Sequence, residues 1–246
     1  MSPVVFLGIK NMKKILYAFL MSLVWCTGVR AEGLVDDTSD PLFLTARGRL
    51  LSQTLFDYFE NGLRVGQYLN YGVVDGLVVG GNFHYQRDFD GDQNGFSSVD
   101  LNALYRVANS ADNHLIYDML GGVKFGGTHR LRSPDFADSV YYLGFRFGQQ
   151  YEYVTLAATV KSSWIFNNEH GMAFIDFSPD LYLRLSADWK VGIGANLRKA
   201  TDKAYDEETV GGRIVRQYGR TQYVGHFDYS FEAEKFVAGL KINILF

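Results

Sequence analysis

Apolar and polar residues alternate along most of the chain from about Thr45 onward. Between Leu77 and Phe89, apolar side chains at odd positions oppose polar side chains such as Asn82 and His84 at even positions. The same pattern recurs in 98–107, 172–185 and 189–199. A period of two is the signature of β-strands with two unlike faces, so the pattern predicts an all-β protein.

Eleven stretches are candidate strands. They are 44–58, 62–72, 77–89, 97–108, 114–126, 139–149, 153–166, 172–185, 189–199, 216–230 and 236–246. They run from 11 to 15 residues, whereas a strand of a soluble sheet has about 5 or 6. A tilted strand that crosses a bilayer needs about 9–11 residues. The lengths therefore favour a membrane barrel.

The connections between these strands alternate in length. Short ones at 73–76, 149–150 and 187–188 alternate with longer polar ones at 90–96, 127–138 and 200–215. Transmembrane barrels have short turns on the periplasmic side and longer loops outside. No linker divides the chain, so we expect a single barrel domain.

Aromatic residues cluster near the ends of the candidate strands. They include Phe56, Tyr58, Tyr71, Phe83, Tyr85, Tyr151, Tyr153, Trp164, Phe166, Trp189, Tyr229 and Phe231. A soluble sandwich or lipocalin-like barrel would turn its apolar face inward. Two aromatic girdles around an aliphatic band instead fit a surface that faces lipid. A closed barrel also leaves no backbone edge unpaired in lipid.

The first 31 residues have the pattern of a secretory signal peptide. Lys13 and Lys14 precede an apolar stretch over 15–25, and Val29-Arg30-Ala31 ends in a small residue. Such a peptide is removed on export. We therefore predict a signal peptide over 1–31 and an outer-membrane barrel over 32–246.

Composition excludes several other classes of protein. Aromatic residues make up 15% of the chain, which excludes a disordered protein. The net charge is -3, so a nucleic-acid partner is not expected. The single cysteine, Cys26, lies in the predicted signal, so the mature chain has no disulfide or thiolate chemistry. No cofactor motif occurs in the mature chain, and none is expected.

The last strand ends on an aromatic residue. Phe246 closes the chain, and Leu240, Ile242 and Ile244 occupy every second position before it. Together with the signal peptide and the alternation of short and long connections, this last strand resembles that of the Gram-negative outer-membrane β-barrel proteins. The resemblance implies that the barrel assembly machinery recognises Phe246 and the last strand, and that the partners are outer-membrane lipid and lipopolysaccharide.

An odd number of strands does not suit this class, because single-chain bacterial barrels have an even number. Either the region 200–230 hides a further strand or one candidate is wrong. We predict an antiparallel up-and-down barrel of about 12 strands, with 10 as the fallback.

The polar face of the strands predicts a lumen lined by charge. The predicted pore-lining residues are Arg64, His84, Asp100, Arg106, Asp118, Lys124, Arg146, Asp176, Arg184 and Arg198. These side chains either line a polar pore or pair across strands and plug the barrel. A barrel of 12 strands lies between filled barrels of about 8 and open ones of 16 or more, so both interpretations stay open.

Two local patterns suggest other chemistry. Asp90, Asp92 and Asn94 have the spacing of the first ligands of a calcium loop, although position 12 is Leu101 rather than Glu. The same residues are common in hairpin loops. His226 and Asp228 share one strand face, and Asp88 and Asp90 form a second, acidic pair. The two pairs together weakly resemble those of the omptin proteases, although the order here is His-x-Asp rather than Asp-x-His.

These observations predict a non-enzymatic, porin-like channel for small polar solutes or ions. The alternative is a non-conducting structural or adhesin-like barrel whose external loops, including 200–215, carry the function. An outer-membrane hydrolase is the third hypothesis.

Overall fold

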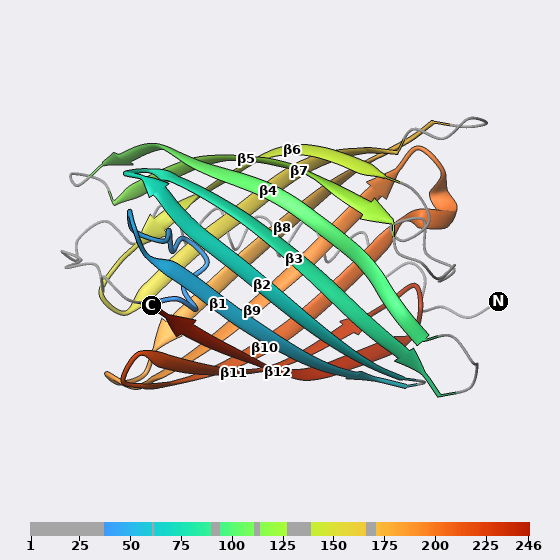
Figure 1. The fold of residues 1–246 in the computed structure, drawn as a ribbon. Coiled ribbons are helices and arrows are strands. Elements are labelled where there is room, and N and C mark those ends of the chain that lie inside the picture. The colour runs from blue at the N-terminus through green and yellow to red at the C-terminus, as the bar shows by residue number, and fades with distance from the viewer. Residues whose placement is uncertain (1–36, 61, 90–93, 111–113, 127–138, 166–170) are drawn as a thin grey trace, which may run out of the picture.

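The structure is a computed structural model that describes residues 37–246 except 61, 90–93, 111–113, 127–138 and 166–170. Twelve strands close into one barrel (Figure 1). They are β1 (Leu50–Phe59), β2 (Gly62–Val74), β3 (Leu77–Asp88), β4 (Asn94–Ser110), β5 (Leu115–Gly126), β6 (Val140–Gln150), β7 (Val154–Ile165), β8 (Met172–Arg184), β9 (Trp189–Ala200), β10 (Glu207–Tyr218), β11 (Thr221–Ser230) and β12 (Lys235–Leu245). A short 3-10 helix, η2 (Lys203–Tyr205), lies between β9 and β10.

Each strand pairs antiparallel with its neighbours in the sequence, and β12 returns to pair with β1. Backbone hydrogen bonds between Leu50 and Phe246 lie at one end of this closing seam. The predicted up-and-down barrel of about 12 strands is therefore confirmed. Among the described residues, no helix is long and apolar enough to span a membrane.

The two ends of the barrel differ. The end that holds Phe246 has connections of two to four residues between strands, and we call it the turn end. The opposite end, the loop end, has connections of two to thirteen residues. Glycines with positive φ at Gly76 (83°) and Gly219 (59°) make tight turns at the turn end, because glycine adopts this conformation without strain.

The strand that the sequence pattern did not predict is β10. The interpretation of 200–215 as a loop is therefore wrong, since only 201–206 connect β9 to β10. Near the turn end of β10 the usual polarity is reversed: Val215 is buried inside, whereas Arg216 lies outside with its guanidinium 5.3 Å from the Trp189 ring centre. This reversal conceals the alternation on which the prediction depended.

The first predicted strand begins later than expected. Residues 44–49 belong to a non-strand stretch that precedes Leu50. Gly48 has a φ of 75°, and its N–H donates to the carbonyl of Gly72 over 2.8 Å. The chain therefore turns into the barrel wall here rather than running straight into β1.

The outer surface is an apolar belt. Leu101, Ile193 and Ile214 are each more than half exposed on this surface. Eight of the predicted girdle residues are exposed large aromatics: Phe56, Tyr58, Tyr71, Phe83, Tyr85, Tyr153, Trp189 and Phe231. Tyr151 was placed wrongly, because its ring is buried against His114 at a centroid distance of 5.0 Å. Phe166 lies outside the described residues.

Candidate functional site: the lumen and its N-terminal segment

A chain of three charges crosses the inner wall of β4, β5 and β6. Arg106, Asp118 and Arg146 are register partners on adjacent strands, so all three face inward. The Asp118 carboxylate accepts from Arg106 Nε and from Arg146 Nε, both over 2.8 Å. Asp118 is completely buried, and the two guanidinium groups are mostly buried. One carboxylate therefore serves two arginines and leaves an excess of positive charge on this part of the wall.

Residues 37–49, which we call the N-terminal segment, lie at the turn end of the barrel (Figure 1). The excess positive charge on the wall faces them. Arg106 Nη2 donates to the carbonyl oxygen of Leu42 over 2.6 Å, and Arg146 Nη2 donates to that of Phe43 over 3.2 Å. The Leu42 side chain packs with Ile116 of β5. The segment is thus held by polar and apolar contacts with the inner wall.

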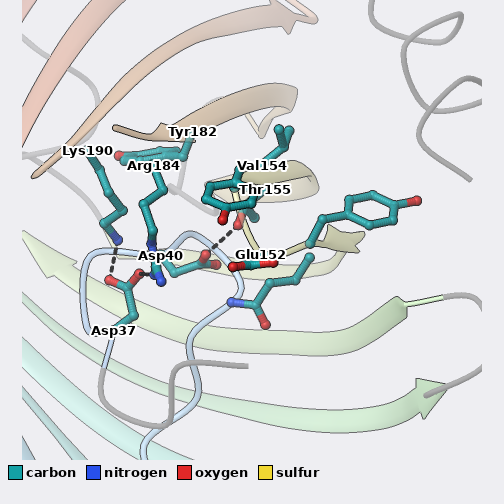
Figure 2. Close-up of a pocket in the computed structure, with 11 residues that line it drawn as sticks. Asp37, Asp40, Glu152, Val154, Thr155, Tyr182, Arg184 and Lys190 are labelled. Carbon is teal, nitrogen blue, oxygen red and sulfur yellow. Dashed lines mark hydrogen bonds and ion pairs between the residues drawn. The ribbon is translucent and has the colours of Figure 1, made fainter. Parts of the chain in front are cut away.

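Asp37 makes the densest set of contacts in the segment. Its carboxylate forms ion pairs with Lys190 of β9 and with Arg184 of β8, the latter at 3.3 Å (Figure 2). Gln222 of β11 donates to it over 3.1 Å, and Ser39 donates over 2.9 Å. Burial raises the pKa of Asp37, but the charge and hydrogen bonds of these partners outweigh that effect and lower the pKa from its ordinary value of 3.8.

Asp40 sits in a different environment three residues later. Its carboxylate accepts from the Thr155 hydroxyl of β7 over 2.5 Å (Figure 2). It also accepts from the Leu42 N–H over 2.8 Å. Deep burial raises the pKa of Asp40, and the neighbouring Asp37 charge adds to that rise. The pKa values of the two carboxyl groups in the segment are therefore shifted in opposite directions.

A second charge cluster joins β1, β2 and β11. Asp57 accepts from Arg64 Nε over 2.9 Å, and His226 Nε2 lies 2.9 Å from its other oxygen. Nearby on the same inner wall, the Tyr68 hydroxyl lies 2.5 Å from His84 Nε2. These contacts tie the first strands of the barrel to the last ones.

A third cluster lies toward the loop end. Asp176 of β8 accepts from Arg198 Nε over 2.8 Å, and Lys161 of β7 lies 3.3 Å from its other oxygen. Arg198 also lies over the Phe174 ring at 4.4 Å, a geometry typical of a cation–π contact. Charges from three adjacent strands therefore meet on one patch of the wall.

The structure describes all ten predicted pore-lining residues. Eight of them form the clusters above, namely Arg64, His84, Arg106, Asp118, Arg146, Asp176, Arg184 and Arg198. The other two, Asp100 and Lys124, are register partners on β4 and β5, and Asp100 accepts from the Tyr142 hydroxyl over 2.8 Å. Whether these side chains line a conducting path stays a prediction.

The sequence analysis also raised a calcium-loop spacing at 90–94 and a shared strand face for His226 and Asp228. Asp90 and Asp92 lie outside the described residues, as does the side chain of Asn94. Among the residues that are described, no group of three or more potential ligands could hold a metal ion. His226 pairs with Asp57 rather than with Asp228, which forms an ion pair with Arg213 at 2.7 Å. His226 and Asp228 therefore share a strand face but do not form a pair.

Sequence reasoning did not identify the N-terminal segment. Asp36, Asp37 and Asp40 form an acidic group shortly after the predicted cleavage point at Ala31, and this is the one signal that the sequence offers. Their partners lie far along the chain: 153 positions separate Asp37 from Lys190. No local spacing rule connects such residues.

No protein-family model matches the sequence, and no curated protein matches it. Several solved structures share the fold. The KdgM porin aligns with a TM-score of 0.61 at 7% identity, over 79% of this chain and 98% of that chain. The COG4313 outer membrane channel from Pseudomonas putida F1 gives 0.65 at 10% identity, over 84% and 98%. The NanC porin gives 0.63 at 6% identity, over 79% and 98%. At these identities the likeness establishes the fold of small outer-membrane barrels.

Proposed function

We propose that this chain is a small porin-like channel of the bacterial outer membrane, and that its N-terminal segment narrows the lumen at the turn end. The observation that carries the proposal is the contrast between the two surfaces of the barrel. The outside is apolar and aromatic, whereas the inside carries Arg, Lys, Asp and His side chains on most strands. A charged inner wall within a lipid-facing barrel suits the passage of small polar solutes or ions.

The orientation follows from the connections. Short turns face the periplasm in transmembrane barrels, so the turn end, Phe246 and the N-terminal segment lie on that side. Lipid and lipopolysaccharide around the barrel, and recognition of the last strand by the assembly machinery, belong to the same proposal. Removal of residues 1–31 before the barrel assembles is also part of the proposal.

A non-conducting barrel is the second candidate function, and one observation favours it. Ion pairs such as Arg146–Asp118 and Arg198–Asp176 connect neighbouring strands, and the N-terminal segment fills part of the lumen. The hydrolase hypothesis draws less support, because Asp57 engages the Nε2 atom that His226 would need as a base.

Conductance across a planar bilayer separates the two candidates. Refolded protein spanning 32–246 gives discrete current steps if it is a channel. A protein that is heat-modifiable on gels, and therefore folded, but gives no steps would overturn the channel and leave the structural barrel.

A further inference from the structure

The inner wall at the turn end concentrates hydrogen-bond donors on a single carboxylate. Lys190 and Arg184 contact Asp37 from β9 and β8 (Figure 2), and Gln222 of β11 donates to the same carboxylate. Side chains of Arg184 and Lys190 are 18% and 9% exposed, so both cations are largely removed from solvent. Buried cations that converge in this way bind an anion strongly, since hydrogen bonds between charged partners are stronger than neutral ones.

The barrel wall fixes this arrangement independently of the segment. Arg184 and Lys190 are direct register partners in the β8–β9 ladder. Like charges directly opposite each other destabilise a sheet unless an anion neutralises them. The Lys190 ammonium also lies 6.0 Å from the ring centre of Tyr182, which precedes Arg184 by two residues on the same face of β8. An anion at this point therefore relieves the repulsion between the two cations, whichever molecule supplies it.

The group that supplies the anion is held without a strand ladder. The backbone hydrogen bonds at Asp40 and Phe43 go to carbonyls within the segment, at Asp37 and Asp40. The first bridge between the described segment and the wall is Arg47 with Gly72. Residues 37–43 are therefore held by side-chain contacts and by bonds from Arg106, Arg146 and Asn243 to backbone carbonyls of the segment, so they can leave the wall without opening the barrel.

We propose that Arg184, Lys190 and Gln222 form a carboxylate-binding site of the lumen, that Asp37 occupies it as an internal ligand, and that carboxylate-bearing solutes compete for it. A solute that takes the site displaces residues 37–43 and widens the turn end. A tethered ligand on a short linker acts at an effective concentration in the millimolar range, so competing solutes must act at similar concentrations. This inference gives a solute class to the proposed channel and rests on that proposed function.

Removal of the internal carboxylate tests the site. In Asp37→Ala protein of the mature chain, refolded in detergent, we expect acetate to bind at the vacated position. Titration calorimetry should give an affinity for acetate at least tenfold higher than that of the wild-type protein. Added acetate should also raise the unfolding temperature of the variant more than chloride does at equal ionic strength.

Two matched variants control the experiment. Asp206→Ala removes a carboxylate that pairs with the exposed Lys199 at 3.0 Å, and it should create no acetate site. Lys190→Gln added to Asp37→Ala should abolish acetate binding. If Asp37→Ala does not refold, Asp37→Asn keeps the side-chain shape and is titrated with the same series.

The result that overturns the proposal is acetate binding that is equal in the variant, wild-type and Asp206→Ala proteins. Phosphate binding as tight as acetate would also overturn it, because the site would then be a general anion site. These readouts do not depend on current. If the protein binds acetate specifically but gives no current steps, the channel function is overturned and the carboxylate site stands. If it conducts but does not bind acetate, the site is overturned and the channel function stands.

Discussion

His226 of β11 reaches across β12 to place its Nε2 atom 2.9 Å from the Asp57 carboxylate of β1. The two residues share one register partner, Gly239, on the strand between them. A Cβ atom at Gly239 would lie 2.5 Å from His226 Cε1 and 2.6 Å from an Asp57 oxygen. The missing side chain therefore permits a contact that ties the first strand to the last two.

Gly239→Ala should weaken this seam. The added methyl group overlaps both partners and the Phe56 carbonyl, and overpacking of this kind costs about 1–3 kcal/mol. We expect the temperature at which the folded barrel converts to the unfolded band on gels to fall. Gly212→Ala is the matched control, since nothing lies within 4 Å of its added Cβ. Equal conversion temperatures for the two variants would contradict the role of Gly239.

Asp118→Asn should destabilise the barrel strongly. The substitution leaves Arg106 and Arg146 close together without their shared carboxylate, and breaking a buried ion pair costs about 3–5 kcal/mol. The urea midpoint of unfolding in lipid vesicles measures the effect. Asp206→Asn, which alters a more exposed pair, should shift the midpoint far less. Similar midpoints for both variants would show that the buried charge chain does not stabilise the wall.

The docking of the N-terminal segment should depend on pH in two opposite ways. The pKa of Asp37 is lowered in the docked state, so its contribution is present above its ordinary value of 3.8 and is lost as pH falls through the lowered pKa. The pKa of Asp40 is raised, so docking strengthens as pH falls through that raised value toward 3.8. Docking is therefore strongest near pH 3.8, where the gain from Asp40 is complete and the loss from Asp37 begins.

Hydrogen exchange of the amides of Asp40 and Phe43, corrected for intrinsic rates, measures this profile. Protection should rise on mild acidification and fall at lower pH. In Asp40→Asn protein the rise should disappear while the fall remains. A rise that persists in Asp40→Asn would assign it to another group and contradict the account.

The sequence was sufficient to predict the barrel because lipid on one side and polar side chains on the other impose a strict alternation on most strands. Such alternation also placed Arg106, Asp118 and Arg146 on the inner wall. It failed at β10, where Val215 points inward and Arg216 outward. The outward Arg216 lies over the Trp189 ring, so a charged side chain occupies the face that is apolar elsewhere.

The contacts of the lumen were beyond prediction for a different reason. Which carboxylate meets which cation depends on strand register and on strands that are remote in sequence. Asp57 meets His226 across the closing seam, and Asp37 meets Lys190 only because the segment folds into the barrel. A periodic pattern determines the face of a residue but not its partner.

Conductance of two proteins in a planar bilayer tests the central claim most directly. The first is the mature chain, residues 32–246, and the second lacks residues 32–43. We predict discrete steps for the mature chain and clearly larger steps for the truncated one, because removal of the segment clears the turn end and exposes Arg184 and Lys190. Silence from both folded proteins, or steps of equal size, would contradict a channel narrowed by its own N-terminal segment.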